Sequence, residues 1–231
     1  FDISGEAMGQ PFRVAGKLLF AYEDGVPANI AVQGLVARLF SSDISGDLKL
    51  DTAGRVPSLS GTLKSQLIDL RQIEALAGSG RGATSGSGSA TGDIREILDD
   101  RISTEWLEQA DIDLSLNVKA FKSSAAEASD IALTVALKDG KLSVSPFWAV
   151  YADSPIKLQA EVEKDGRALV AAVDLSIKGA DFDRLAGTAM DTAGLEAGGD
   201  LSVSVKTSGR TVGELMAGAT VNAKAALPLV R

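Results

Sequence analysis

The sequence predicts a mostly β fold: a curved antiparallel sheet, built as a β-groove or half-barrel or as a sandwich-like pair of layers, with a few short helices. Three observations predict it. Apolar and polar residues alternate with a period of two along many segments, hairpin dipeptides join several of these segments, and helical spacing is confined to short stretches. Such alternation is typical of antiparallel strands with one apolar face and one hydrated face.

The first third of the chain alternates less cleanly than the rest. Apolar residues recur at every second position from Val14 to Phe20, against Arg13 and Lys17 on the other side. Further candidate strands cover residues 28–33, 46–51 and 59–66. Short connections between them favour antiparallel pairing of consecutive strands.

The second half carries the clearest strands. Residues 111–120 place every apolar side chain at an even position, and Asp139-Gly140 is a dipeptide typical of a type I′ hairpin turn. A second turn is predicted at Asp165-Gly166. Alternation predicts the remaining strands at residues 131–137, 142–144, 156–162, 169–177, 201–205 and 221–225.

Helices are predicted only as short elements between strands. The segment 211–218 has Thr211 and Glu214 at the spacing of a capping box and ends at Gly218. Aspartate starts and apolar spacing predict others at residues 69–77, 93–100 and 181–187.

The chain divides into two β-rich units. Residues 1–77 form the first, residues 78–92 a flexible Gly/Ser linker, and residues 93–231 the second. The linker holds no apolar residue larger than Ala, and although its glycines suggest a phosphate cradle, the Gly-Lys-Ser/Thr ending of that motif is missing. A weak repeat relates residues 48–78 to residues 158–187.

Composition excludes several classes of function. The chain has no cysteine and no histidine, so thiolate nucleophiles, histidine-based triads and the common zinc sites are excluded. A net charge of −8 argues against a nucleic-acid partner. We therefore expect no enzyme activity, no cofactor and no metal.

Two residue pairs that suggest chemistry have simpler explanations. Ser154 and Lys157 match a Ser-x-x-Lys spacing, but they lie on a predicted strand, where positions three apart point to opposite faces. Asp111 and Asp113 share a face that continues with polar residues, which a solvated outer face explains. Adjacent Phe147 and Trp148 either floor a ligand site or plug the end of an apolar core.

One arrangement resembles a known family. Trp106 and Leu107, the alternating strand 111–119, a second strand and then Asp139-Gly-Lys-Leu-Ser-Val-Ser-Pro146 are similar to the AsmA family of bacterial envelope proteins. The strand, turn, short helix and glycine of residues 199–218 fit the same family. Asp153-Ser154 departs from it, since the family often carries glycines there.

The resemblance implies a periplasmic protein, tethered in its full-length form to the inner membrane, that supports outer-membrane biogenesis by carrying phospholipid or another lipid. Relatives include TamB-like proteins, whose curved sheet forms an open apolar groove. The alternative is a structural or assembly module that binds outer-membrane proteins through a sheet edge, with no lipid cargo.

The candidate lipid-binding residues are the apolar positions of the clearest strands. They are aliphatic, and aromatic residues make up only 5% of the chain, which favours a trough of low specificity over a shaped pocket. They are Ile112, Leu114, Leu116, Val118, Ile131, Leu133, Val135, Leu142, Val144, Ile156 and Leu158. The same side chains would form the dry core of a closed β-sandwich, and alternation alone does not separate the two.

Overall fold

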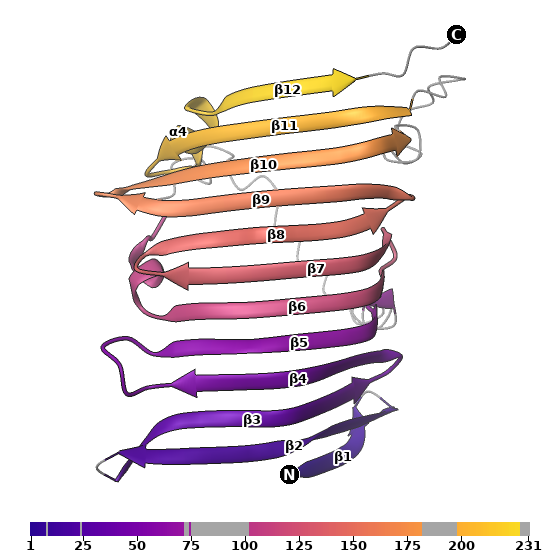
Figure 1. Ribbon diagram of the computed structural model, residues 1–231, viewed down its shortest axis with the longest axis vertical. Coiled ribbons are helices and arrows are strands. Elements are labelled where there is room, and N and C mark those ends of the chain that lie inside the picture. The colour runs from indigo at the N-terminus through magenta and orange to yellow at the C-terminus, as the bar shows by residue number, and fades with distance from the viewer. Residues whose placement is uncertain (8, 24, 72–73, 75–101, 182–197, 227–231) are drawn as a thin grey trace, which may run out of the picture.

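A computed structural model shows, in the residues that it describes, one long sheet of twelve strands in which each strand lies beside its neighbours in sequence (Figure 1). The structure describes all residues except 8, 24, 72–73, 75–101, 182–197 and 227–231. The strands are β1 (Asp2–Ala7), β2 (Gln10–Glu23), β3 (Val26–Leu39), β4 (Ser42–Asp51), β5 (Ser58–Asp69), β6 (Asp111–Lys122), β7 (Glu127–Lys138), β8 (Lys141–Tyr151), β9 (Ser154–Asp165), β10 (Ala168–Asp181), β11 (Gly198–Gly209) and β12 (Thr220–Ala226). The mostly β prediction is confirmed.

Pairing follows the expected antiparallel pattern with one exception. Strands β5 and β6 run parallel, with Leu59 opposite Ile112 and Leu63 opposite Leu116. The sequence predicted antiparallel pairing for strands joined by short turns, but here residues 70–110, including the predicted linker, join the two strands. A connection of that length returns the chain to the other end of the sheet, so the next strand runs in the same direction.

The predicted turns hold with a small shift in one of them. Asp139 and Gly140 connect β7 to β8 with positive φ angles of 50° and 77°, as a type I′ turn requires. The second turn lies at Gly166–Arg167 instead of Asp165-Gly166, because Asp165 still pairs with Ala168 as part of the ladder.

Two short helices are described over their full length, and Arg71 and Glu74 are also helical. Helix α4 (Val212–Ala217) starts as predicted, with the Thr211 hydroxyl accepting a hydrogen bond from the backbone N–H of Glu214 at 3.1 Å. The 3₁₀ helix η1 (Glu105–Glu108) contains the Trp106-Leu107 pair and was not predicted as a helix. The predicted linker 78–92 and helix 93–100 lie outside the described residues, as do parts of the predicted helices 69–77 and 181–187.

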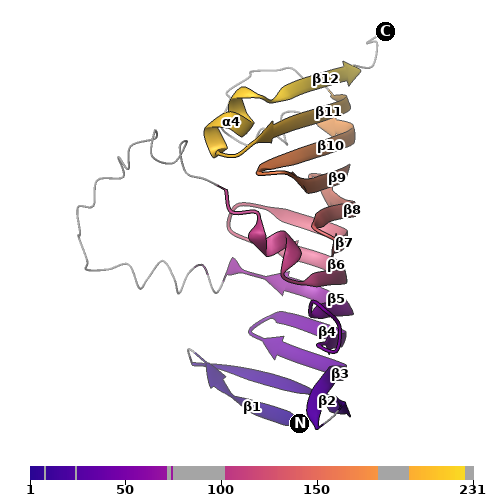
Figure 2. The ribbon, with the colours of Figure 1, turned by 90° about the vertical axis from the view of Figure 1, so that its left-hand side faces the viewer.

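The sheet is a single layer that does not close. Seen edge-on in Figure 2, it carries η1 and α4 on one side only, and the hairpins nearest the viewer bend toward that side. Within the described part of the chain only eight hydrophobic residues are buried: Ala28, Leu107, Val118, Leu137, Ala149, Leu169, Ile177 and Ala180. The sandwich alternative is therefore wrong for the described residues, because no second sheet packs on this one.

Candidate functional site

Strand register gathers the apolar side chains onto one face of the sheet, the apolar face. One row of paired residues crosses it from β2 to β12, and each member is aliphatic or glycine. The row reads Leu18, Val32, Leu48, Gly61, Leu114, Val135, Val144, Ala160, Val173, Val205 and Val221. At ~4.8 Å between strands, such a row extends for about 48 Å.

A second row runs beside the first along the middle of the apolar face. It reads Leu35, Gly46, Leu63, Leu116, Leu133, Phe147, Leu158, Leu175, Val203 and Ala223. Successive rows on one face lie two residues apart along each strand, which is about 6.8 Å. The apolar face is thus continuous in both directions.

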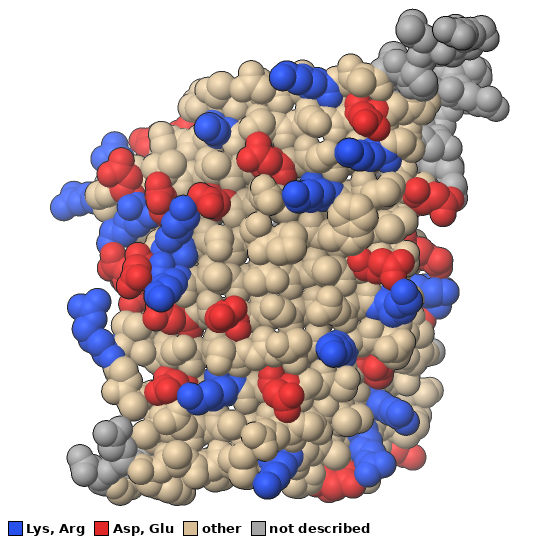
Figure 3. All heavy atoms as spheres, viewed as in Figure 1, with Lys and Arg blue, Asp and Glu red and all other residues tan. Residues whose placement is uncertain are grey.

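The opposite side, the polar face, carries the charged and hydroxyl side chains. Figure 3 shows this face, with lysine, arginine and acidic residues interspersed over its whole length and denser at the left margin. Several charges pair across strands, as Lys119 does with Asp130 at 2.6 Å and Lys141 with Glu161 at 2.8 Å. This face keeps the sheet hydrated, and the two faces differ as the alternation predicts.

Much of the apolar face is exposed. Near its first edge, Ile3, Phe20 and Tyr22 are 57%, 49% and 64% exposed, and at the other end Val221 is 59% exposed. Most of the aliphatic residues between them are only half-buried. Large exposed apolar surfaces of this extent mark binding sites in folded proteins.

Helices border the apolar face along one margin. Ile102 donates its backbone N–H to the carbonyl oxygen of Arg210 at the end of β11, and Glu108 pairs with Lys164 of β9 at 3.0 Å. The segment 102–110 therefore runs past the strand ends from β11 back to the start of β6 (Figure 2). Helix η1 contacts β7 there, and Leu107 and Leu137 are 1% and 2% exposed. Side chains of the sheet pack in a core there, and a second group of buried residues, Val118, Ala149, Ile177 and Ala180, lies toward the opposite strand ends.

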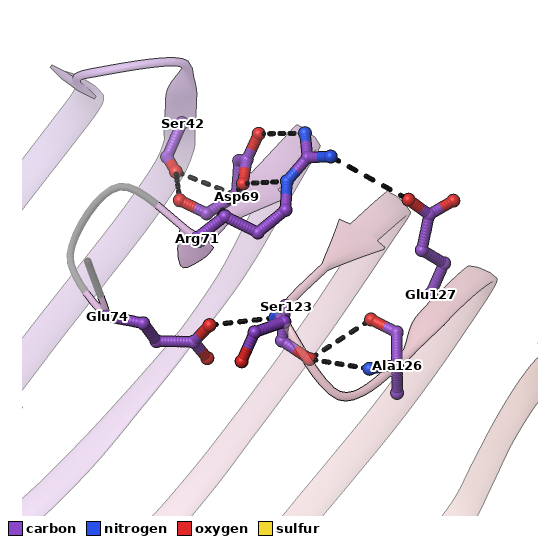
Figure 4. A network of polar contacts seen from close by, with 8 residues as sticks. Ser42, Asp69, Arg71, Glu74, Ser123, Ala126 and Glu127 are labelled. Atoms are coloured by element: carbon purple, nitrogen blue, oxygen red, sulfur yellow. Dashed lines mark hydrogen bonds and ion pairs between the residues drawn. The ribbon is translucent and has the colours of Figure 1, made fainter. Parts of the chain in front are cut away.

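Polar contacts fix the other end of β5 and β6 (Figure 4). Arg71 donates two hydrogen bonds to the Asp69 carboxylate, at 2.9 and 2.6 Å, and lies 3.8 Å from Glu127 on β7. The Glu74 carboxylate accepts from the backbone N–H of Ser124, and Ser42 on β4 bonds the Asp69 backbone. These contacts hold the parallel strands in register where no hairpin turn does so.

The same contacts change the acidity of Asp69. Hydrogen bonding from Arg71 lowers the pKa of the Asp69 carboxyl from 3.8 to about 2. The carboxylate is therefore charged throughout the neutral range, and its stabilising contacts depend on that charge.

Every candidate lipid-binding residue lies on the apolar face. Ile112, Leu114, Leu116 and Val118 of β6 pair with Leu137, Val135, Leu133 and Ile131 of β7, and the candidates of β8 and β9 continue the same rows. Val118 is buried, at 3% exposed, while the other ten are half-buried. The structure brings them together, and their binding of lipid stays a prediction.

The sequence reasoning missed more than half of this face. The apolar positions of β1 to β5 and of β10 to β12 belong to it, because the alternation continues through them. Phe147, considered above only together with Trp148, was left out of the candidate set for a different reason, and the two do not plug a core as a pair, since Trp148 is 40% exposed. A bulge in β8 between Val144 and Phe147 shifts the alternation by one, so Phe147 joins Val144 on the apolar face and Trp148 faces the other way.

The two residue pairs that suggested chemistry lie as the simpler explanations require. Ser154 is 1% exposed on the apolar side, while Lys157 is exposed on the polar face. Asp111 and Asp113 follow the polar face of β6. Among the described residues, no three acidic side chains lie together as a metal site would need.

A family model, that of the AsmA family, matches residues 23–224. The chain belongs to the AsmA family. That family is associated with the bacterial envelope, and the open apolar sheet fits it. Searches of curated proteins and of solved structures each return no significant match. Within the described part of this AsmA protein, no helix has the length and apolarity to cross a membrane.

Proposed function

We propose that the apolar face binds the acyl chains of lipids and carries phospholipid between the inner and outer membranes, in support of outer-membrane biogenesis. The observation that carries the proposal is the lack of a covering layer over the middle of this face in the described residues. Membership of the AsmA family supports a role in the envelope. The chain acts from the periplasm, with its full-length form tethered to the inner membrane.

Energetics favour a surface of this kind over a deep pocket. Moving an acyl chain of about 15 methylenes through water costs roughly 12 kcal/mol, at ~0.8 kcal/mol per methylene. A carrier must offset that cost along the whole path without holding the lipid at one place. Two adjacent apolar rows that cross every strand from β3 to β12 offer similar contacts at each step.

The side chains of the apolar face also suit a carrier that binds acyl chains with low selectivity. They are mainly Leu, Val and Ala, and apart from Phe147 the two central rows hold no aromatic residue. An aliphatic surface discriminates weakly between acyl chains of different length, because each additional methylene changes the binding free energy by only ~1 kcal/mol. The headgroup remains in water beyond the trough.

Photocrosslinking tests the proposal directly. A photoreactive amino acid is placed at Leu116 or Leu133 on the apolar face, and at Asn117 or Thr134 on the polar face of the same strands as matched controls. After expression in a Gram-negative cell, phospholipid attached to the protein is measured by mass spectrometry. Lipid adducts at Leu116 and Leu133 but not at the controls support lipid carriage. No adduct at any position, or equal adducts on both faces, contradicts it.

A second candidate is a sheet-edge assembly module, favoured by one observation. All seven residues of β12 are exposed, and Lys224 is its one charged residue. Unprotected edges of this kind pair with further strands. Cysteines introduced at Asn222 and Lys224 and oxidised in cells would form disulfides with a cysteine-bearing outer-membrane barrel strand if this candidate is correct. A lipid-free protein that crosslinks in this way favours the assembly role.

A further inference from the structure

The polar face holds an exposed aromatic side chain, which is not part of the apolar face. Trp148 pairs with Ala132 of β7 and Lys157 of β9, both on the polar face, and is 40% exposed. The bulge that sends Phe147 into the trough leaves Ser145 and Pro146 exposed beside it. Its ring stacks on no other aromatic ring among the described residues. An indole in this position is available to a ligand from solvent.

Trp148 lies in a straight row of polar residues that crosses the sheet. The row reads Lys64, Asn117, Ala132, Trp148, Lys157, Ser176, Ser202 and Lys224, from β5 to β12. A parallel row beside it contains Gln159, Asp174, Ser204 and Asn222. Together they place ammonium and amide groups on both sides of one indole, and hydroxyl groups on its β9 to β12 side.

Two shallow hollows lie along this row, one on each side of Trp148. The first, of about 270 Å³, covers β5 to β7 and is lined by Lys64, Asn117 and Ala132 among others. The second, of about 370 Å³, covers β9 to β12 and is lined by Lys157, Ser176, Ser202 and Lys224 among others. A ligand that filled both would pass over the indole.

The charge of the row indicates the chemistry of that ligand. Lys64, Lys157 and Lys224 form no ion pair with another described residue. The two carboxylates that line the hollows have partners: Asp130 pairs with Lys119 at 2.6 Å, and Asp174 accepts a hydrogen bond from Ser204 at 2.6 Å. In a chain of net charge −8, three such lysines in one row complement an acidic ligand.

We propose that this row binds an extended acidic polysaccharide, with the apolar side of one sugar ring stacked on Trp148. Sugars present an apolar ring face and a rim of hydroxyls, which the indole and the flanking Ser, Asn and Gln side chains match. The ~4.8 Å strand spacing is close to the rise per sugar of an extended β-1,4-linked chain, so each strand meets one sugar. The lysines pair with carboxylates of the sugars. This site is on the face opposite the trough and does not depend on lipid carriage.

Calorimetric titration of the purified chain tests the proposal with three probes: a hexamer of β-1,4-linked mannuronate, cellohexaose with the same linkage but no charge, and a single-stranded oligothymidylate. The matched control for Trp148→Ala is Trp106→Ala, which removes an indole that is 42% exposed in η1. We expect Trp148→Ala to weaken mannuronate binding about tenfold or more, since stacking and area burial together exceed ~1.4 kcal/mol. Trp106→Ala should change it less than twofold.

A double variant, Lys157→Gln with Lys224→Gln, separates charge from stacking. Because Lys64 remains, it should lower the affinity for mannuronate toward that for cellohexaose, and it should leave cellohexaose binding unchanged. The proposal is overturned if neither sugar binds at millimolar concentration, if the two tryptophan variants behave alike, or if oligothymidylate binds more tightly than mannuronate. Lipid content measured on the same Trp148→Ala preparation should equal that of the wild type, so failure of this site is distinguishable from failure of lipid carriage.

Discussion

Replacement of Leu133 by Asp tests whether the middle of the apolar face is open. Leu133 is half-buried between Leu116 and Phe147. Full burial of a leucine contributes about 2 kcal/mol, so the loss of a half-buried one should lower the free energy of unfolding by roughly 1 kcal/mol. The new carboxylate stays in water when no lipid is bound. The delipidated variant should therefore remain folded.

Leu137, on the same face of the same strand, provides the comparison. It is 2% exposed where η1 contacts β7, so an aspartate there is placed in a packed core. Leu137→Asp should cost about 4 kcal/mol or more, because a buried charge has no partner. Urea unfolding of the delipidated proteins measures both values. Equal losses at the two positions would show that a layer covers Leu133 and would refute the open-trough reasoning.

The same variant has a larger effect on lipid binding. Acyl chains on Leu133→Asp must desolvate a carboxylate, and a penalty of ~3 kcal/mol lowers affinity about a hundredfold. Phospholipid recovered per protein by mass spectrometry should therefore fall steeply, while Thr134→Asp on the polar face leaves it unchanged. Lipid retained equally by both variants contradicts binding at this face.

Three further predictions concern stability. The Ser65 hydroxyl is buried on the apolar face without a hydrogen-bond partner among the described residues, so Ser65→Ala should raise the free energy of unfolding by about 1 kcal/mol, whereas Ser60→Ala on the polar face should change it little. Because its pKa is lowered, Asp69 stabilises the fold fully above pH ~4 and loses that contribution as the pH falls through about 2. The stability difference between wild type and Asp69→Asn, measured by denaturant unfolding, should therefore shrink from pH 5 to pH 2, and a constant difference would contradict the assignment. Gly46 has φ 148°, and an added Cβ would lie 2.0 Å from the Thr62 carbonyl oxygen, so Gly46→Ala should lower the melting temperature sharply, while Gly166→Ala in an open turn should lower it far less.

The sequence by itself determined the strands and their two faces. Alternation along residues 111–120 and the Asp139-Gly140 turn depend only on neighbouring residues, because side chains on a strand point alternately and the turn needs positive φ. The capping pair Thr211 and Glu214 is local in the same sense, and it forms as expected. Alternation alone was therefore enough to place the eleven candidate residues on one face.

The tertiary structure decided what lies above that face. A strand pattern reports one apolar side equally for a sandwich core and for an open trough, because either environment excludes polar side chains. Only the order of the twelve strands and their exposure separate the two. The parallel pairing of β5 with β6, and the bulge that parts Phe147 from Trp148, also depend on contacts between residues distant in sequence or on pairing with neighbouring strands, which alternation within one strand does not encode.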